Sequence, residues 1–208
     1  MNSKKVFLSI ILAAAIGACQ KAPNEAQSSN EILKSPISSV VFGKWRGDCQ
    51  VWGSGEYQTS GTPYFSFSET EAATVTEMFK GDGCSGELNG RMKMVFEFTV
   101  ESQSSSAPEI YNILVSARKI LQIFYDQDTV NASNTIAYCG FTDWVAGVEK
   151  DVSDRDCFTG PKLGEKIYSI IRISGGKLNL GQPDDANNGT SPSLRHKDID
   201  STKTFVKF

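Results

Sequence analysis

A strict alternation of apolar and polar residues near the middle of the chain constrains the fold more than any other feature. In RMKMVFEFTV, residues 91–100, a large apolar side chain occupies every even position from Met92 to Val100, and three of the four positions between them are polar. Successive side chains of a β-strand point to opposite faces of the sheet, so this pattern predicts a strand with one buried face.

Other short segments repeat this pattern and are separated by residues that favour turns. Strands are predicted at 64–68, 74–79, 167–173 and 177–180, and turns at Gly81-Asp82-Gly83, Asn89-Gly90 and Gly175-Gly176. Strands at this density, joined by glycine-rich turns, indicate a mainly β fold that is either an antiparallel sandwich or a barrel.

The segment from 109 to 124 fits two structures equally well. Its apolar residues recur at helical spacing, and its many Ile, Val and Tyr residues equally favour a long strand. We leave that choice open and expect one short helix at 128–137.

The N-terminal region has the organisation of an export signal. Lys4 and Lys5 precede an apolar run of eleven residues, 6–16, which is too short to span a bilayer of roughly 30 Å. The run ends in Ile16-Gly17-Ala18-Cys19, which resembles the lipobox of bacterial lipoproteins. The resemblance implies cleavage before Cys19, a diacylglyceryl group on its thiol and an acyl group on its new amino terminus.

This resemblance divides the chain into three parts. We expect a signal peptide at residues 1–18, a lipidated flexible tether at 19–40 and one folded domain at 41–208. The tether is rich in Ser, Asn, Gln, Lys and Glu and has too few apolar residues to offset the entropy of ordering. Gln20 after the cysteine resembles the pattern sorted to the outer membrane of Gram-negative bacteria, which predicts a lipid-anchored protein of the bacterial cell envelope.

The four remaining cysteines are expected to form two disulfides, because an exported chain passes through an oxidising compartment. Three pairings exist, and we favour Cys49 with Cys84 and Cys139 with Cys157, since each closes a local loop. A zinc site would need a close pair such as C-x2-C, and no two of these cysteines have fewer than seventeen residues between them. No metal site is therefore predicted.

Several short motifs in 41–208 resemble those of exported bacterial lipocalin-like proteins. They are the G-x-W of Gly43 and Trp45, the cysteines Cys49 and Cys84, the late Arg195, and the stretches YCGFTDW at 138–144 and GTSPSLRHKDID at 189–200. The resemblance implies an antiparallel up-and-down β-barrel of about eight strands. In lipocalins the tryptophan packs across the closed end of the barrel under a late arginine, so Trp45 and Arg195 are expected to form a barrel plug. The alternative is that Trp45 is an ordinary core aromatic and Arg195 a solvated loop charge.

The sequence offers little that supports catalysis. His196 is the only histidine, and its polar, charged neighbours predict an exposed loop residue. The motifs of serine hydrolases, zinc proteases and P-loop enzymes do not occur. The stretch DDANNGT at 184–190 lacks the ligands of a calcium loop and is predicted to be a surface turn. We therefore expect no enzyme activity, no catalytic residue and no cofactor.

Three functions remain open. The first is a lipocalin-like protein that holds a small apolar ligand, for which Met92, Met94, Phe96 and Phe98 on one strand face are the candidate binding residues. The second is a structural or interaction protein of the envelope whose barrel is filled by its own side chains. The third is a hydrolase or isomerase of unknown type. The expected partners are the membrane, through Cys19, and a small lipophilic ligand, whereas a net charge of −3 and the lack of a basic stripe argue against nucleic acid.

Overall fold

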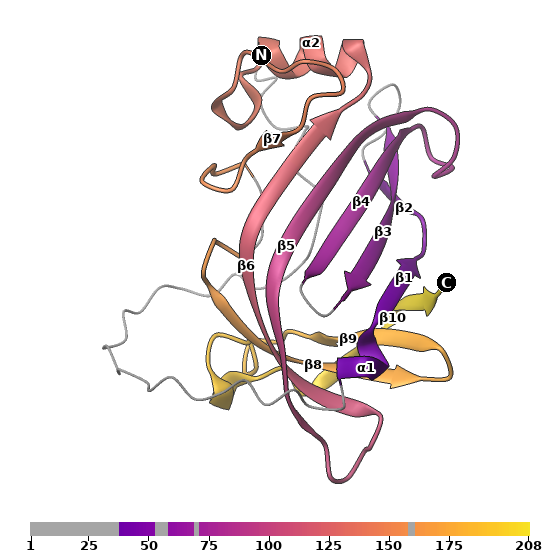
Figure 1. Cartoon of the computed structure of the whole chain (residues 1–208), viewed down its shortest axis with the longest axis vertical. Helices are drawn as coiled ribbons and strands as arrows, with labels where there is room; N and C mark the ends of the chain where they lie inside the picture. Colours follow the sequence, from indigo (N-terminus) through magenta and orange to yellow (C-terminus); the bar gives the residue numbers. More distant parts are fainter. Residues whose placement is uncertain (1–37, 53–57, 69–70, 158–160) are drawn as a thin grey trace.

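Eight antiparallel strands close into a barrel in the computed structural model, which describes residues 38–52, 58–68, 71–157 and 161–208 (Figure 1). The predicted signal peptide, Cys19 and the tether up to residue 37 lie outside these residues. The described strands are β1 (Gly43–Gly47), β2 (Gln50–Trp52), β3 (Thr59–Phe67), β4 (Ala72–Lys80), β5 (Leu88–Gln103), β6 (Ile110–Phe124), β7 (Lys150–Asp151), β8 (Lys166–Ser174), β9 (Lys177–Gln182) and β10 (Asp198–Lys207).

The barrel has up-and-down topology, as predicted. Strands pair in the order β1, β10, β9, β8, β6, β5, β4, β3, and β1 then pairs with β3 to close the circle. Short β2 and β7 extend the sheet along β3 and β6. The hairpin between β8 and β9 turns at Gly175 and Gly176, both of which have positive φ, a conformation that glycine adopts without strain.

The ambiguous segment 109–124 is strand β6, paired with β5 on one side and with β8 and β7 on the other. Its apparent helical spacing has a physical cause. Phe96 pairs with Ala117 whereas Val95 pairs with Lys119, so Arg118 is an extra residue in a β-bulge. The inner face therefore carries odd positions up to Ala117 and even positions from Ile120 onward, which mixes two strand patterns into one that resembles a helix.

The helices are short and lie at opposite ends of the barrel (Figure 1). They are α1 (Ser38–Val41), α2 (Gln127–Thr135), which confirms the expected short helix, and the 3-10 turns η2 (Tyr138–Gly140) and η3 (Pro192–Leu194). Within the described residues, no helix is long and apolar enough to cross a membrane.

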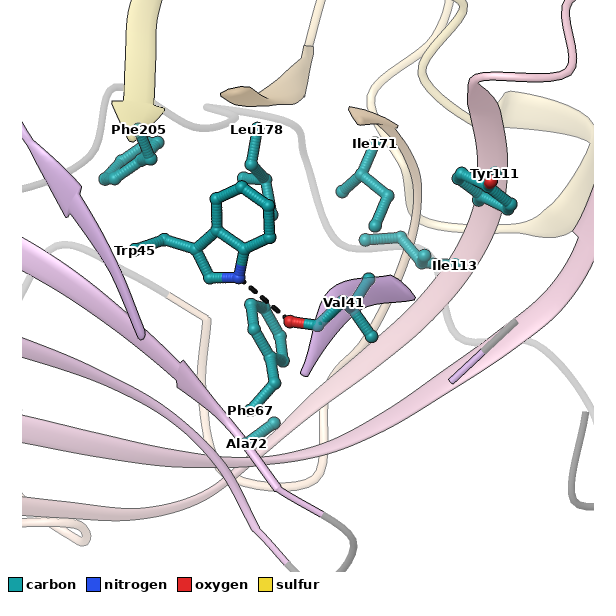
Figure 2. Packing of buried hydrophobic residues seen from close by; sticks show 9 residues of the cluster. All are labelled: Val41, Trp45, Phe67, Ala72, Tyr111, Ile113, Ile171, Leu178 and Phe205. Atoms are coloured by element: carbon teal, nitrogen blue, oxygen red, sulfur yellow. Dashed lines mark hydrogen bonds between the residues drawn. The ribbon is translucent and has the colours of Figure 1, made fainter. Parts of the chain in front are cut away.

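Two apolar clusters fill the ends of the interior. The lower core (Figure 2) consists of Val41, Trp45, Phe67, Ala72, Tyr111, Ile113, Ile171, Leu178 and Phe205. The cap cluster consists of Met92, Met94, Ala117, Ile120, Phe124, Val130, Cys139, Trp144 and Val152. The second cluster forms because residues 125–157, which follow β6, pack onto inner residues of β5 and β6. We call residues 125–157 the cap.

Both predicted disulfides are present. Cys49 joins Cys84 and so ties the end of β1 to the turn between β4 and β5. Cys139 joins Cys157 and closes a loop within the cap. Cys84 and Cys139 both have positive φ, at 44° and 54°, so each bridge holds a backbone conformation that non-glycine residues seldom adopt.

Candidate functional site

The candidate site is the stretch of barrel interior beside the lower core. In this stretch, strand register places a set of apolar side chains on the inner face of the barrel. These side chains point into the barrel and yet are only half-buried. This interior band consists of Phe65, Phe96, Phe98, Val100, Val115, Ile173 and Leu180. All seven pack against the lower core, and Phe96 also packs against the cap cluster. Half-buried apolar side chains on an inner face are the surface that an apolar guest would cover.

Aromatic rings dominate one wall of this interior. The Phe65 ring stacks on Phe67 with 5.9 Å between centroids and meets Phe205 edge-on at 4.7 Å. Phe98 lies 4.9 Å from Phe67. These rings come from β3, β5 and β10, so closure of the barrel brings together residues that are distant in sequence.

The four candidate ligand residues divide into two pairs. Phe96 and Phe98 belong to the interior band. Met92 and Met94 are 4% and 6% exposed, because the cap packs on them. The structure therefore places half of the predicted set in the interior band and half under the cap.

Trp45 lies at the end of the barrel that α1 covers. Its side chain is 1% exposed, and its indole Nε1 donates a hydrogen bond of 2.9 Å to the carbonyl oxygen of Val41 (Figure 2). The ring is surrounded by Phe67, Leu178 and Phe205. This end is closed by a tryptophan and by the helix turn that precedes its strand.

The cation over Trp45 is Lys207, and the stacking expected from Arg195 is wrong. Lys207 Nζ lies 5.3 Å from the indole ring, because Lys207 is paired with Trp45 in register. Arg195 instead lies 5.4 Å over the Tyr168 ring.

Arg195 fastens the segment before β10 to the barrel wall. Its Nη1 donates to the carbonyl oxygens of Ile113 and Ser169, at 2.6 and 2.7 Å, and its Nη2 pairs with Glu101. The arginine is therefore neither the expected plug nor a solvated loop charge.

His196 is buried, which corrects the expectation of an exposed loop residue. It is 5% exposed, and its Nδ1 shares a hydrogen bond of 2.8 Å with Ser169 Oγ, while Nε2 is buried without a hydrogen-bond partner. Burial lowers the pKa of the imidazole below its usual value, although the carboxylate of Asp184 opposes the shift. A methyl group at Gly189 would lie 2.7 Å from Nε2, so this glycine allows the loop backbone to approach the ring.

Serine and histidine in contact are also the first two members of a hydrolase triad, but this pair is enclosed. Ser169 is 8% exposed, and its hydroxyl also lies 3.4 Å from the carbonyl oxygen of Ile170. A nucleophile must reach a substrate carbonyl at roughly 3 Å, which requires open space above the hydroxyl. The geometry is that of a packed hydrogen bond between β8 and the loop before β10.

Polar residues on the inner face were missed by the sequence reasoning. Thr76, Met92 and Gln122 form one row across β4, β5 and β6, and Gln122 is 2% exposed. Its Nε2 donates to the carbonyl oxygen of Ile123 at 3.2 Å. The bulge at Arg118 turns Gln122 inward, and the residue types around it carry no mark of that bulge.

Ionisable groups elsewhere serve local structure. Asp184 accepts hydrogen bonds from the backbone of Ala186 and Asn187, which makes 184–190 the predicted surface turn, and the Asn187 side chain holds the Asp184 pKa below its usual value. Among the described residues, no group of three or more His, Cys, Asp or Glu side chains is arranged to hold a metal ion.

Comparison with protein-family models found no match for the chain, and comparison with curated proteins found none either.

Proposed function

We propose that this chain is a membrane-anchored, non-catalytic lipoprotein that holds a small apolar ligand inside a lipocalin-like barrel. The observation that carries the ligand proposal is the interior band, whose seven apolar side chains stay half-buried on the inner face. Covering them gains roughly 25 cal/mol for each Å² of apolar surface removed from water. We place this ligand between Trp45 with α1 at one end of the barrel and the cap at the other.

Dye binding tests this proposal directly. The mature chain is titrated with a lipophilic fluorescent dye, and saturable binding with one site is expected. Phe98→Trp adds volume to the interior band and should weaken dye affinity about tenfold, which corresponds to roughly 1.4 kcal/mol. Val75→Trp is the matched control, because Val75 lies on the outer face of β4 between Tyr64 and Lys93.

Two results would contradict the ligand proposal. One is the absence of saturable binding, and the other is equal affinity in both tryptophan variants. Either would favour the second function, an envelope interaction protein with a filled barrel. The packing of Met92 and Met94 beneath the cap already shows that part of the interior is filled in that way.

The anchor is supported by the lipobox-like Ile16-Gly17-Ala18-Cys19. Several acyl chains hold a protein on a bilayer far more firmly than one chain does. Cys19→Ser should abolish acylation, measured as the mass of the N-terminal peptide, and release the protein from the membrane fraction. Gln20→Asp is the neighbouring control, which should keep the acyl mass. An unacylated wild-type chain would refute the anchor without touching the ligand proposal.

A further inference from the structure

One outer face of the barrel combines three cations with exposed apolar side chains. Strand register sets Arg46 on β1, Val206 on β10 and Lys177 on β9 in a single row across three neighbouring strands. Lys44 lies two positions before Arg46, and the backbone N–H of Phe208 donates to its carbonyl oxygen at 3.1 Å. We call Lys44, Arg46, Lys177, Val206 and Phe208 the basic face.

Its apolar members are among the most exposed large hydrophobic residues in the described chain. Val206 is 51% exposed and Phe208 is 66% exposed. The Phe208 ring lies 5.8 Å from the Tyr64 ring, over which the Arg46 guanidinium lies at 5.9 Å. Aromatic, aliphatic and cationic groups therefore occupy one continuous outer surface.

The three cations of this face form no ion pair with any described residue, although the chain as a whole is acidic. Three cations elsewhere on the barrel wall do have acidic partners. Lys93 pairs with Glu71 at 2.8 Å, Lys119 with Asp151 at 3.6 Å, and Arg118 with Glu97. Lys44, Arg46 and Lys177 therefore carry positive charge that no described carboxylate neutralises in an ion pair.

The face lies where the described chain begins. Helix α1 leads within a few residues into β1, and the C-terminus lies beside the same strands (Figure 1). Residues 20–37 separate Cys19 from α1. Even fully extended at up to about 3.6 Å per residue, these eighteen residues reach roughly 65 Å. A domain attached to lipid at Cys19 is therefore kept within that distance of the bilayer. The end of the barrel that carries α1 and β1 is the part that directly follows the tether.

We propose that the basic face docks on an anionic phospholipid bilayer, with Lys44, Arg46 and Lys177 on lipid phosphates and Val206 and Phe208 at the headgroup boundary. The inference rests on the anchor in the proposed function, since the anchor supplies the high local concentration. Each Lys or Arg near an anionic surface adds to the affinity for that surface. At physiological salt, screening makes this attraction fall off over about 8 to 10 Å. Exposed apolar side chains between the cations bury surface at the same contact.

Paired probes on the full mature chain test the docking. A single cysteine is introduced as Val206→Cys or as Val148→Cys in the cap, where Val148 is likewise 48% exposed. Each is labelled with an environment-sensitive dye, and the lipidated protein is reconstituted on phosphatidylglycerol-containing vesicles. We expect the dye at position 206 to be quenched by lipid-borne quenchers and shielded from aqueous iodide, and the dye at 148 to show the reverse.

Charge reversal gives the second readout. Lys44→Glu, Arg46→Glu and Lys177→Glu together should abolish the protection at position 206, as should 1 M salt. The matched control reverses Lys162, Lys166 and Lys197, which are exposed cations away from this face. Equal iodide access at 206 and 148, or equal effects of the two triple variants, would overturn the docking surface.

The docking proposal and the anchor proposal can be contradicted independently of each other. A chain that lacks the acyl mass at Cys19 refutes the anchor. The same chain then tests the basic face by flotation with phosphatidylglycerol vesicles, where docking predicts binding that is at least tenfold weaker in the Lys44, Arg46 and Lys177 variant and is lost at high salt. Flotation that is equal for both triple variants contradicts the docking surface in that case as well.

Discussion

Asn134 holds the backbone of Trp144 at both of its polar groups. The Asn134 Oδ1 accepts a 2.6 Å hydrogen bond from the Trp144 N–H, and its Nδ2 donates at 3.0 Å to the Trp144 carbonyl oxygen. Trp144 is 2% exposed and packs edge-on against Phe124, with 4.9 Å between ring centroids. One amide side chain at the end of α2 thus fixes the aromatic residue that joins the cap to β6.

Replacing Asn134 with alanine should therefore destabilise the domain by about 2 kcal/mol, because a buried N–H and C=O lose their partners. Asn131→Ala in the same helix is the control, since Asn131 is exposed and gains the same helix propensity. Urea unfolding measures both. A loss in the Asn134 variant no greater than that of the control would contradict the role of this contact.

A double-mutant cycle separates the two cations assigned to Trp45. Trp45→Leu and Lys207→Met should show a coupling energy of about 0.5 kcal/mol, the size of an exposed cation–π contact. Trp45→Leu and Arg195→Met should show a smaller coupling, additive within about 0.3 kcal/mol, because Arg195 bonds to the carbonyl groups of Ile113 and Ser169 instead. Both cycles are measured by equilibrium unfolding, and clear coupling to Arg195 would restore the lipocalin-like plug.

Much of the strand content follows from residue patterns alone, whereas the choice of a barrel over a sandwich came from the lipocalin-like resemblance. The alternation from Met92 to Val100, the Gly175-Gly176 turn and the even number of domain cysteines each depend on local chemistry, and each is confirmed. The resemblance of Gly43 and Trp45 to a lipocalin motif placed the tryptophan at a barrel end, where the structure also has it.

The parts that the sequence did not reveal depend on long-range contacts. The bulge at Arg118 arises from register with β5, so nothing near residue 118 shows that Gln122 points inward. His196 has charged neighbours on both sides, and yet its side chain is enclosed, because Gly189 has no side chain beside the ring and Gly181 has none beside its Cβ. Likewise, Lys207 reaches Trp45 only because β1 and β10 meet when the barrel closes.

Asp126 should make the domain sensitive to strong acid. The hydrogen bond from Lys80 lowers the pKa of Asp126 to about 2, and its carboxylate also accepts from the Thr129 N–H as the N-cap of α2. A folded-state pKa below the unfolded value of 3.8 stabilises the fold above about pH 4, and this stability is lost as the pH falls toward 2.

Asp126→Ser separates the effect of the carboxylate charge from the effect of the N-cap hydrogen bond. Serine is an equally good N-cap, so the loss at pH 7 should stay below about 1 kcal/mol, the usual range for an exposed ion pair. The acid limb of the stability curve between pH 4 and 2 should become shallower in this variant. Asp126→Ala loses the cap as well and should cost about 1 kcal/mol more at pH 7. Identical acid limbs in wild type and Asp126→Ser would contradict the assignment.

His196 should make the domain less stable in mildly acidic solution. Its pKa is lowered in the folded state by burial, so between that value and the unfolded pKa of about 6.5 the unfolded chain binds more protons. The free energy of unfolding therefore falls as the pH drops through 6.5, with a slope of at most about 1.4 kcal/mol per pH unit, and levels off below the folded-state pKa.

Urea unfolding from pH 7.5 to 5.0 measures this slope. His196→Gln keeps a polar group near Ser169 and cannot titrate, so its curve should be flat in that window. Asp126→Ser is the control that should keep the slope, because Asp126 titrates near pH 2. As His196 is the only histidine in the chain, an unchanged slope in His196→Gln would show that its burial does not govern stability in this range.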